Sequence, residues 1–161
     1  MKRVLLLRHA KSKRGPEYDT DFERPLAKRG KGDSAKVGAF LTEQDLIPDQ
    51  IYSSSAKRAR QTAERCAEAA GYEGEIRFHD TLYMGGVEAY LDLLANTDDS
   101  AVTVLCVGHN PDMAEMVETL SGHWARMPTA ALARIEFDVE HWEDLVPGEG
   151  NLVWVQEPRA L

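Results

Sequence analysis

Two short runs of consecutive apolar residues constrain most strongly how this chain can fold. One run, Val4 to Leu7, is too short for a helix, and the other, Val102 to Val107, is longer and rich in β-branched side chains. A strand covered on both faces gives a continuous apolar run, whereas a strand with one solvent-facing side alternates. We therefore expect both runs to be central strands of a sheet that helices cover on its two faces.

Helical and extended patterns alternate along the remainder of the chain. Helical spacing of apolar residues, or richness in Ala, Arg and Glu, predicts helices over residues 26–41, 56–70 and 87–94. A further helix is expected to open at Asn110 as N-cap, with Pro111 in its first turn. Shorter extended stretches predict strands at residues 50–53, 132–137 and 152–155. This order predicts an α/β fold, a three-layer αβα sandwich around a mainly parallel central sheet, whose later strands can run antiparallel.

The composition is that of an ordinary globular protein, and nothing divides residues 1–161 into more than a single domain. The 19 basic and 27 acidic residues give a net charge of −8, which repels nucleic-acid backbones and anionic membranes unless a local basic patch overrides it. The apolar start ends at Arg8, too early for a signal peptide, and no run approaches the ~20 residues of a membrane span. Cys66 and Cys106 stand alone, without the spacing of metal ligands. We expect a cytoplasmic protein with no metal and no cofactor, and with neither nucleic acid nor membrane as partner.

Three expected strand ends deliver Arg or His to one edge of the sheet. Arg8 and His9 follow the first apolar run, His109 follows the second, and Arg58 lies in the first turn of the helix after residues 50–53. Ligands of open α/β sheets bind at the carboxyl ends of the strands, where a helix N-terminus adds partial positive charge. Arginine offers a fork of donors that suits phosphate, and neutral imidazole is a nucleophile near pH 7. Each residue alone has an ordinary structural explanation, but together they indicate phosphate chemistry.

The polar loop from Lys11 to Arg24 directly follows the first expected strand and is well placed to line a site. Its alternative is a surface loop without function. Within it, Asp21 and Arg24 either belong to the site or form a local ion pair that fixes the loop. His79, His123 and His141 are assigned structural or surface roles. Trp124, Trp142 and Trp154 are assigned packing roles, with the rim of the site as an alternative for Trp124.

Longer motifs spread over nearly the whole chain point to a known family. Arg8-His9-Ala10 is close to an Arg-His-Gly signature, and residues 108–111 read Gly-His-Asn-Pro. Residues 54–63 match Ser-x-x-x-Arg-Ala-x-Gln-Thr-Ala, and segments 21–30 and 128–131 are of a kind found in one branch of the same family. The chain thus resembles the histidine phosphatase superfamily, the phosphoglycerate mutase-like group, and in particular its small SixA-type phosphohistidine phosphatases.

The resemblance implies a phosphoglycerate mutase-like fold and a phosphatase that needs no metal ion. In such an enzyme His9 attacks phosphorus and becomes phosphorylated. Arg8, Arg58 and His109 bind the phosphate oxygens together with His9 until water releases phosphate. Phosphoryl transfer needs chiefly positioning and fixed positive charge, which these side chains can supply.

One family feature is missing from this chain. Many ester-cleaving relatives carry a glutamate after the third strand that protonates the leaving oxygen, whereas residues 80–86 contain none. Asp80 and Glu88 are candidate acids if a loop brings either inward; otherwise Asp80 is a turn residue and Glu88 an exposed charge at a helix start. An alkoxide leaves poorly without an acid, but protonated phosphohistidine departs as neutral imidazole, whose conjugate acid has a pKa of ~6.5.

The sequence therefore favours a phosphatase for protein phosphohistidine, with a phosphorelay or phosphotransfer domain as partner. A phosphatase for small phosphorylated metabolites is the alternative. A third hypothesis, from another class, is a non-enzymatic module that recognises phosphate.

Overall fold

Six strands form a single sheet at the centre of the computed structural model, which describes residues 1–161. Their order in the sheet is β3-β2-β4-β1-β5-β6. The strands are β1 (Lys2–Arg8), β2 (Gln50–Ser54), β3 (Ile76–His79), β4 (Thr103–Gly108), β5 (Leu132–Phe137) and β6 (Asn151–Gln156). β1, β4, β2 and β3 are parallel, β5 is antiparallel to β1, and β6 is antiparallel to β5. The expected mainly parallel sheet with antiparallel later strands is confirmed.

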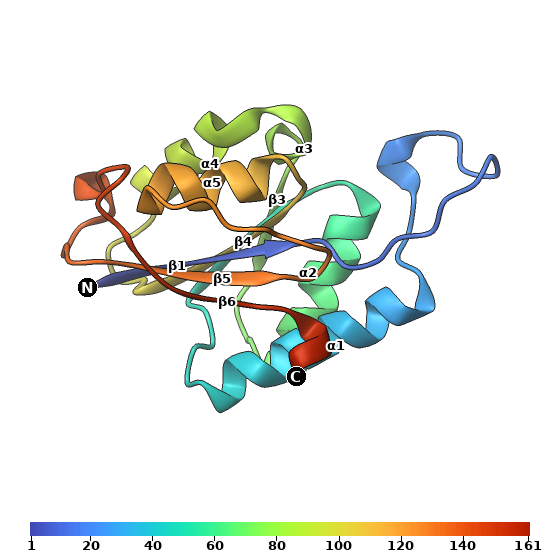
Figure 1. The fold of residues 1–161 in the computed structure, drawn as a ribbon, viewed down its shortest axis with the longest axis horizontal. Coiled ribbons are helices and arrows are strands. Elements are labelled where there is room, and N and C mark those ends of the chain that lie inside the picture. The colour runs from blue at the N-terminus through green and yellow to red at the C-terminus, as the bar shows by residue number, and fades with distance from the viewer.

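Helices cover both faces of this sheet (Figure 1). α1 (Lys28–Glu43) and α2 (Lys57–Ala70) pack on one face. α3 (Thr81–Met84), α4 (Gly86–Ala95) and α5 (Asp112–Ser121) pack on the other. Short 3₁₀ helices lie in the connections at Asp21–Glu23, Trp142–Asp144 and Pro158–Ala160. The structure has the three-layer αβα architecture that the sequence predicts.

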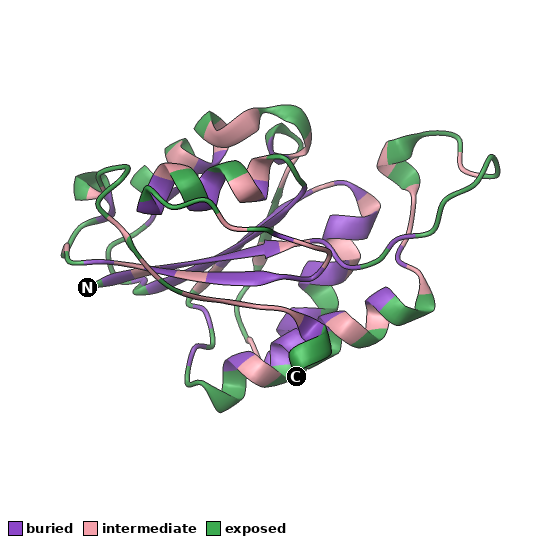
Figure 2. Cartoon of the chain, in the orientation of Figure 1, coloured by how far each residue is buried: buried purple, intermediate pink, exposed green.

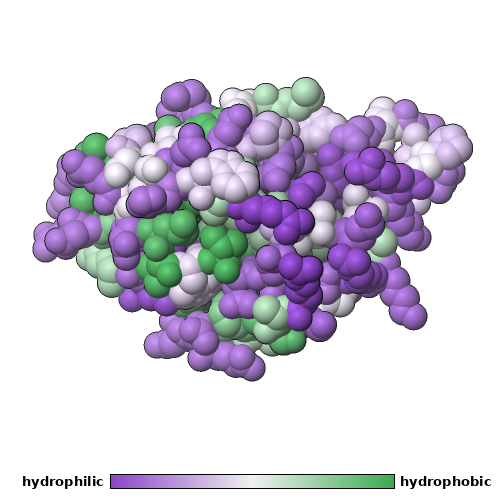
Figure 3. All heavy atoms as spheres, in the orientation of Figure 1, coloured by the Kyte–Doolittle hydropathy of each residue, from purple (hydrophilic) through white to green (hydrophobic).

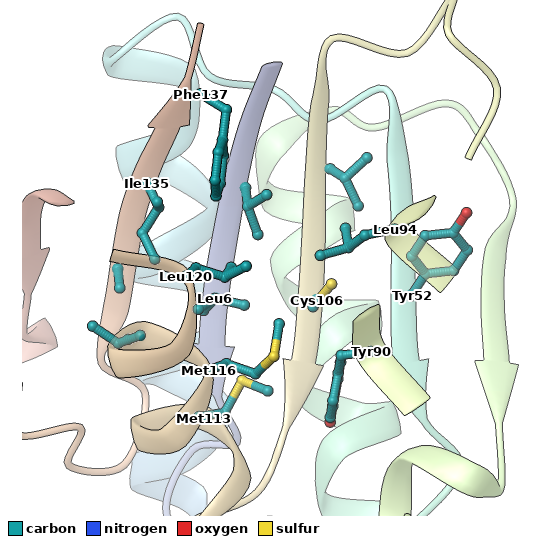
Figure 4. Packing of buried hydrophobic residues seen from close by; sticks show 14 of the residues in the cluster. Leu6, Tyr52, Tyr90, Leu94, Cys106, Met113, Met116, Leu120, Ile135 and Phe137 are labelled. Atoms are coloured by element: carbon teal, nitrogen blue, oxygen red, sulfur yellow. The ribbon is translucent and has the colours of Figure 1, made fainter. Parts of the chain in front are cut away.

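β1 shows why its apolar run is continuous. Leu5 and Leu7 join the core between the sheet and α1 and α2, whereas Val4 and Leu6 join the core on the face of α4 and α5. All four side chains are fully buried, and burying each stabilises the fold by about 1.5–3 kcal/mol. Figure 2 shows the buried residues concentrated along the central strands. Figure 4 shows the core on the face of α4 and α5, where side chains of the strands face those of the helices. The run therefore places β1, and the residues that follow it, at the middle of the sheet.

α5 begins at Asp112, one residue later than expected, because its N-cap is Pro111 and not Asn110. The Asn110 side chain instead joins two segments. Its Oδ1 accepts a hydrogen bond from the Ala114 N–H (3.2 Å), and its Nδ2 donates to the Met127 carbonyl (2.8 Å). Asn110 thus links the start of α5 to the loop that precedes β5.

The packing role expected for all three tryptophans is wrong for Trp124, which is 69% exposed. Trp142 is fully buried and donates from Nε1 to the Ala101 carbonyl (2.8 Å). Trp154 packs its ring edge-on against Phe40. The sequence carries no signal that separates Trp124 from the other two, because exposure is decided by the tertiary fold.

The surface is unevenly polar. In Figure 3 the end of the molecule that carries the loop after β1 is dominated by hydrophilic atoms, while apolar atoms gather over the other half. None of the helices combines the length and the apolar character that crossing a membrane requires. No group of three or more His, Cys, Asp or Glu side chains is arranged to hold a metal ion.

Candidate active site

The parallel register brings two sequence-predicted histidines together. Arg8 of β1 is level with Gly108 of β4, so the next residues, His9 and His109, leave neighbouring strands at the same height. The His9 N–H donates to the Gly108 carbonyl (2.8 Å), and the two imidazole rings lie 5.2 Å apart between centroids. Both side chains are buried at the edge of the sheet where an α/β fold binds its ligands.

His9 is held in the tautomer that suits a nucleophile. Its Nδ1 lies 2.8 Å from the Ala10 carbonyl, and because a carbonyl only accepts hydrogen bonds, Nδ1 carries the proton. Burial is the main cause that lowers the pKa of His9 to about 3; the Ala10 hydrogen bond opposes this shift, and the nearby His109, Arg58 and Arg8 add to it. Near pH 7 the ring is therefore neutral, with a free electron pair on Nε2.

His109 is held by Ser54 at the end of β2. The Ser54 Oγ accepts from the Ala56 N–H (3.2 Å) and lies 2.9 Å from Nε2 of His109, so its own proton is available for that nitrogen. When Nε2 accepts the hydrogen bond from Ser54, the proton of neutral His109 resides on Nδ1, which is buried without a hydrogen-bond partner. Burial, with Arg58 next in importance, lowers the pKa of His109 to about 4.

The two predicted arginines flank these rings and are only partly paired. Arg8 Nη1 donates to the Met127 carbonyl (3.2 Å). Arg58 donates from Nη1 to the Asp21 carbonyl (2.7 Å) and from Nη2 to the Asp21 carboxylate (2.9 Å). The Nε atoms of both arginines are buried without a partner. Three of the four such side-chain atoms in the molecule thus belong to Arg8, Arg58 and His109, and each can donate to an oxyanion.

These side chains line a cavity of about 180 Å³, the strand-end cavity, whose ten lining residues include no acidic and no apolar residue. Besides the two histidines it is lined by five basic residues: Arg8, Lys11, Arg14, Arg24 and Arg58. A small, wholly polar cavity with several guanidinium groups fits a phosphoryl group better than any apolar ligand. The loop 11–24 supplies part of this lining, so it does form part of the site.

A second cavity of about 350 Å³, the side cavity, adjoins the first through Arg58, His109 and Asn110. Tyr83 lines it, donates from its hydroxyl to Asp21 Oδ2 (2.6 Å), and sets its ring edge-on to His109 at 5.4 Å. The pKa of the Asp21 carboxyl lies well below its usual range, first because of the Tyr83 hydrogen bond and then because of Arg58 and Arg24. Asp21 is therefore a fixed anion that orients Arg58.

Sequence comparison decides the family. A model of the histidine phosphatase superfamily (branch 1) matches residues 4–83. An uncharacterized chloroplastic protein of Arabidopsis thaliana is 31% identical over an alignment that covers 97% of this chain and 76% of the relative. The chain belongs to the histidine phosphatase superfamily. The structure of this histidine phosphatase agrees with that membership.

Two solved structures share its fold over nearly their whole length. The protein histidine phosphatase SixA complexed with tungstate has a TM-score of 0.84 at 24% identity, with 98% of each chain covered. A provisionally assigned phosphohistidine phosphatase SixA of Agrobacterium tumefaciens has a TM-score of 0.83 at 29% identity, again with 98% of each chain covered. The fold is therefore that of the SixA and phosphoglycerate mutase-like structures, as the motifs implied.

Three motif residues of this histidine phosphatase act through hydrogen bonds that hold the site together. Thr62 Oγ1 accepts from the Ala10 N–H (3.0 Å) and so ties α2 to the residue after His9. Gln61 Oε1 accepts from the Leu26 N–H (2.8 Å) and fixes the end of the loop before α1. Ser54 orients His109, as described above. A side chain added at Gly108 would collide with the Tyr90 hydroxyl, so the packing of Tyr90 requires a glycine at this position.

The structure does not bring the two candidate acids to the site. Asp80 is exposed and lines neither the strand-end cavity nor the side cavity. Glu88 lines a separate surface depression beside Asp92. Two other carboxyl groups line the side cavity: Asp21, the fixed anion described above, and Asp112, whose pKa is raised by burial. Sequence reasoning missed Asp112 and Tyr83, although Asp112 could have been noticed from its place three residues after His109.

Proposed function

We propose that this histidine phosphatase hydrolyses phosphohistidine in a protein, without a metal ion, through a phosphohistidine intermediate on His9. The observation that carries the proposal is the strand-end cavity itself. It combines a neutral imidazole with a free Nε2 and three buried nitrogen atoms, on Arg8, Arg58 and His109, that lack acceptors. A bound phosphoryl group supplies those acceptors.

The chemistry follows from the tautomers. Nε2 of His9 attacks phosphorus, the bond from phosphorus to the substrate ring breaks, and a substrate ring protonated on its other nitrogen leaves as neutral imidazole. Water then attacks the phosphorus, the bond to His9 breaks, and inorganic phosphate leaves with both hydrogens of the water. Arg8, Arg58 and His109 donate to the equatorial oxygens in both steps, where fixed positive charge stabilises the transition state.

Substrate choice rests on the leaving group. Because Asp80 and Glu88 lie outside both cavities, neither is placed to protonate an alkoxide. Imidazole needs no such acid. The SixA neighbour complexed with tungstate is a protein histidine phosphatase, which supports a phosphorelay or phosphotransfer domain as partner. The expectations of a cytoplasmic location, and of a partner that is neither nucleic acid nor membrane, stay predictions.

A phosphatase for small phosphorylated metabolites is the second candidate, and one observation favours it. Asp112 lines the side cavity, where a leaving group would sit, and its raised pKa helps it to hold a proton for an ester oxygen. A non-enzymatic module is disfavoured because recognition alone does not require an unprotonated imidazole at the centre of the cavity.

One kinetic comparison separates the candidates. We would measure kcat/KM in excess EDTA for a phosphohistidine peptide, phenyl phosphate and an alkyl phosphate, with wild-type protein and with Asp112→Asn. We expect the order phosphohistidine, then phenyl, then alkyl, and little change with Asp112→Asn on phosphohistidine. The second candidate would be established if wild-type protein cleaved the alkyl phosphate as efficiently as phosphohistidine and Asp112→Asn lost the activity on the alkyl phosphate. Loss of all activity in EDTA, restored by one metal, would contradict metal independence.

A further inference from the structure

A third cavity, here called the basic groove, lies beside the strand-end cavity and has no part in the chemistry above. It has a volume of about 560 Å³ and is formed by α1, the loop before β5 and the C-terminal 3₁₀ helix. Its lining contains no hydrophobic residue. Thr129 lines both cavities, so the groove begins at the rim of the site.

The charges around these two cavities differ from those of the whole chain. The groove is lined by Arg29, Lys36, Arg126 and Arg159, and the strand-end cavity by five other basic residues. Nine of the 19 basic residues of the chain therefore face these cavities, but only two of its 27 acidic residues do. A protein of net charge −8 thus carries a local positive field around its site.

Stability does not account for this arrangement. Arg29 lies in the first turn of α1, where a positive charge opposes the helix dipole. Its ion pair with Asp33, one turn on, joins Nε to Oδ2 at 3.5 Å with the Arg29 side chain 72% exposed. Arg126 and Arg159 lie 4.0 and 3.5 Å from Glu157, with side chains 70% and 80% exposed. Ion pairs this exposed contribute about 0–1 kcal/mol each. Lys36 has no ion pair at all, so the groove keeps positive charge available for a ligand.

We infer that the basic groove binds an acidic segment that flanks the phosphohistidine of the substrate protein. This inference rests on the proposed function. A phosphoryl group seated against His9 places the neighbouring residues of its own chain at the rim, and Thr129 marks where the rim opens into the groove. Arginine and lysine there pair with Asp and Glu of the substrate. Nucleic acid fits less well, because the lining offers no aromatic ring on which a base can stack.

The test uses two phosphohistidine peptides of equal length, one flanked by Asp and Glu and the other by Asn and Gln. The groove variant is Lys36→Glu with Arg126→Glu. Its matched control is Arg65→Glu with Arg77→Glu, which makes the same change of charge at exposed residues that line neither the groove nor the strand-end cavity. Phenyl phosphate, which is too small to reach the groove, reports the basal activity.

We expect wild-type protein and the control to prefer the acidic peptide by about tenfold in kcat/KM at low salt, which is the size of two or three partly exposed charge pairs. The preference shrinks in 0.5 M salt because such pairs are screened. The groove variant loses the preference, while its activity on phenyl phosphate changes less than twofold. Equal efficiency on both peptides in wild-type protein, or the same loss in the control, would overturn the inference.

A binding measurement keeps this outcome separate from the proposed function. Fluorescence anisotropy follows the unphosphorylated acidic peptide, and an oligonucleotide of equal charge, on wild-type protein and on the groove variant. If neither phosphohistidine peptide is hydrolysed although phenyl phosphate is, the proposed function fails. Binding of the unphosphorylated peptide then tests by itself whether the groove binds an acidic segment. If the oligonucleotide bound more tightly than the peptide, and the groove variant lost that binding, the ligand of the groove would be nucleic acid and not an acidic segment.

Discussion

The two ends of the central sheet use polar groups in opposite ways. At the amino ends of the strands, Lys2 Nζ donates to the carbonyls of Asp99 (2.6 Å) and Ala101 (2.9 Å), and Asp49 accepts from the N–H groups of Val102 and Thr103. Each of these groups has a partner within the protein. At the carboxyl ends, the buried nitrogens of Arg8, Arg58 and His109 have none.

The difference separates groups that hold the fold together from groups kept free for a ligand. A buried donor without an acceptor costs about 1–3 kcal/mol, so a protein keeps several together only where something else binds them. The amino end should therefore matter for stability and little for catalysis, and the carboxyl end the reverse. Four predictions test this contrast, from the largest expected effect to the smallest.

His9→Ala should lower kcat by about four orders of magnitude or more, because it removes the nucleophile. The free energy of unfolding should change by less than about 1 kcal/mol, since His9 lies at a strand end and belongs to neither hydrophobic core. Turnover of phenyl phosphate and urea unfolding measure the two quantities. During turnover by wild-type protein, acid-labile phosphate should be trapped on His9; label on a serine or on Cys66 would exclude the mechanism.

Arg58→Ala should lower kcat/KM by about 10²–10³, the usual effect of removing one fixed donor from a developing anion. Asp21→Asn should act through Arg58 and cost about tenfold, because it weakens the carboxylate that orients the guanidinium. Addition of guanidinium ion should restore part of the activity of Arg58→Ala but not of Asp21→Asn. If Asp21→Asn were as damaging as Arg58→Ala, Asp21 would have a direct part in the reaction.

Trp142→Phe tests the amino end. It removes the bond from Nε1 to the Ala101 carbonyl and leaves a small gap, so the free energy of unfolding should fall by about 1–2 kcal/mol. kcat/KM on phenyl phosphate should stay within twofold of wild type. A stable but poorly active variant would show that the two ends are coupled, and the contrast would then fail.

The pKa values of the histidines at the two ends of the sheet should be shifted in opposite directions. The pKa values of His9 and His109 are lowered to about 3 and about 4, so their neutral forms stabilise the fold above about pH 6.5, and this contribution is lost as pH falls toward 4. The pKa of His141 is raised by its hydrogen bond to Asp99, so its contribution is present below about pH 6.5 and lost at higher pH. In phosphate-free buffer, NMR should show flat shifts for His9 and His109 between pH 8 and 5, and a titrating His141. A midpoint near pH 6.5 for His9 would argue against its burial as described.

The sequence predicts most of the architecture because its strongest signals are local. The apolar runs at Val4–Leu7 and Val102–Val107 place two central strands and the residues that follow them. β3 was not predicted, since it is a four-residue edge strand with no fully buried residue. α3 is a single turn, too short for a periodic pattern to detect.

The residues of the site likewise include some that the sequence predicts and some that it does not. His9, Arg8, Arg58 and His109 could be named from their strand ends and motifs, and the structure brings all four together. Tyr83 and Asp112 could not, because their place in the side cavity depends on how α3 and α5 pack against the loop that carries Asp21. The basic groove joins residues more than a hundred positions apart, such as Arg29 and Arg159, so no local pattern contains it.

The buried nitrogens without acceptors also bear on how the enzyme responds to its product. Inorganic phosphate has the same tetrahedral oxygens as the group being transferred, so the donors that stabilise the transition state also retain the released ion. Phosphate should therefore compete with substrate and raise the melting temperature, since any ligand that binds only the folded chain stabilises it. Turnover then falls as phosphate accumulates, and the enzyme works fastest where free phosphate is scarce.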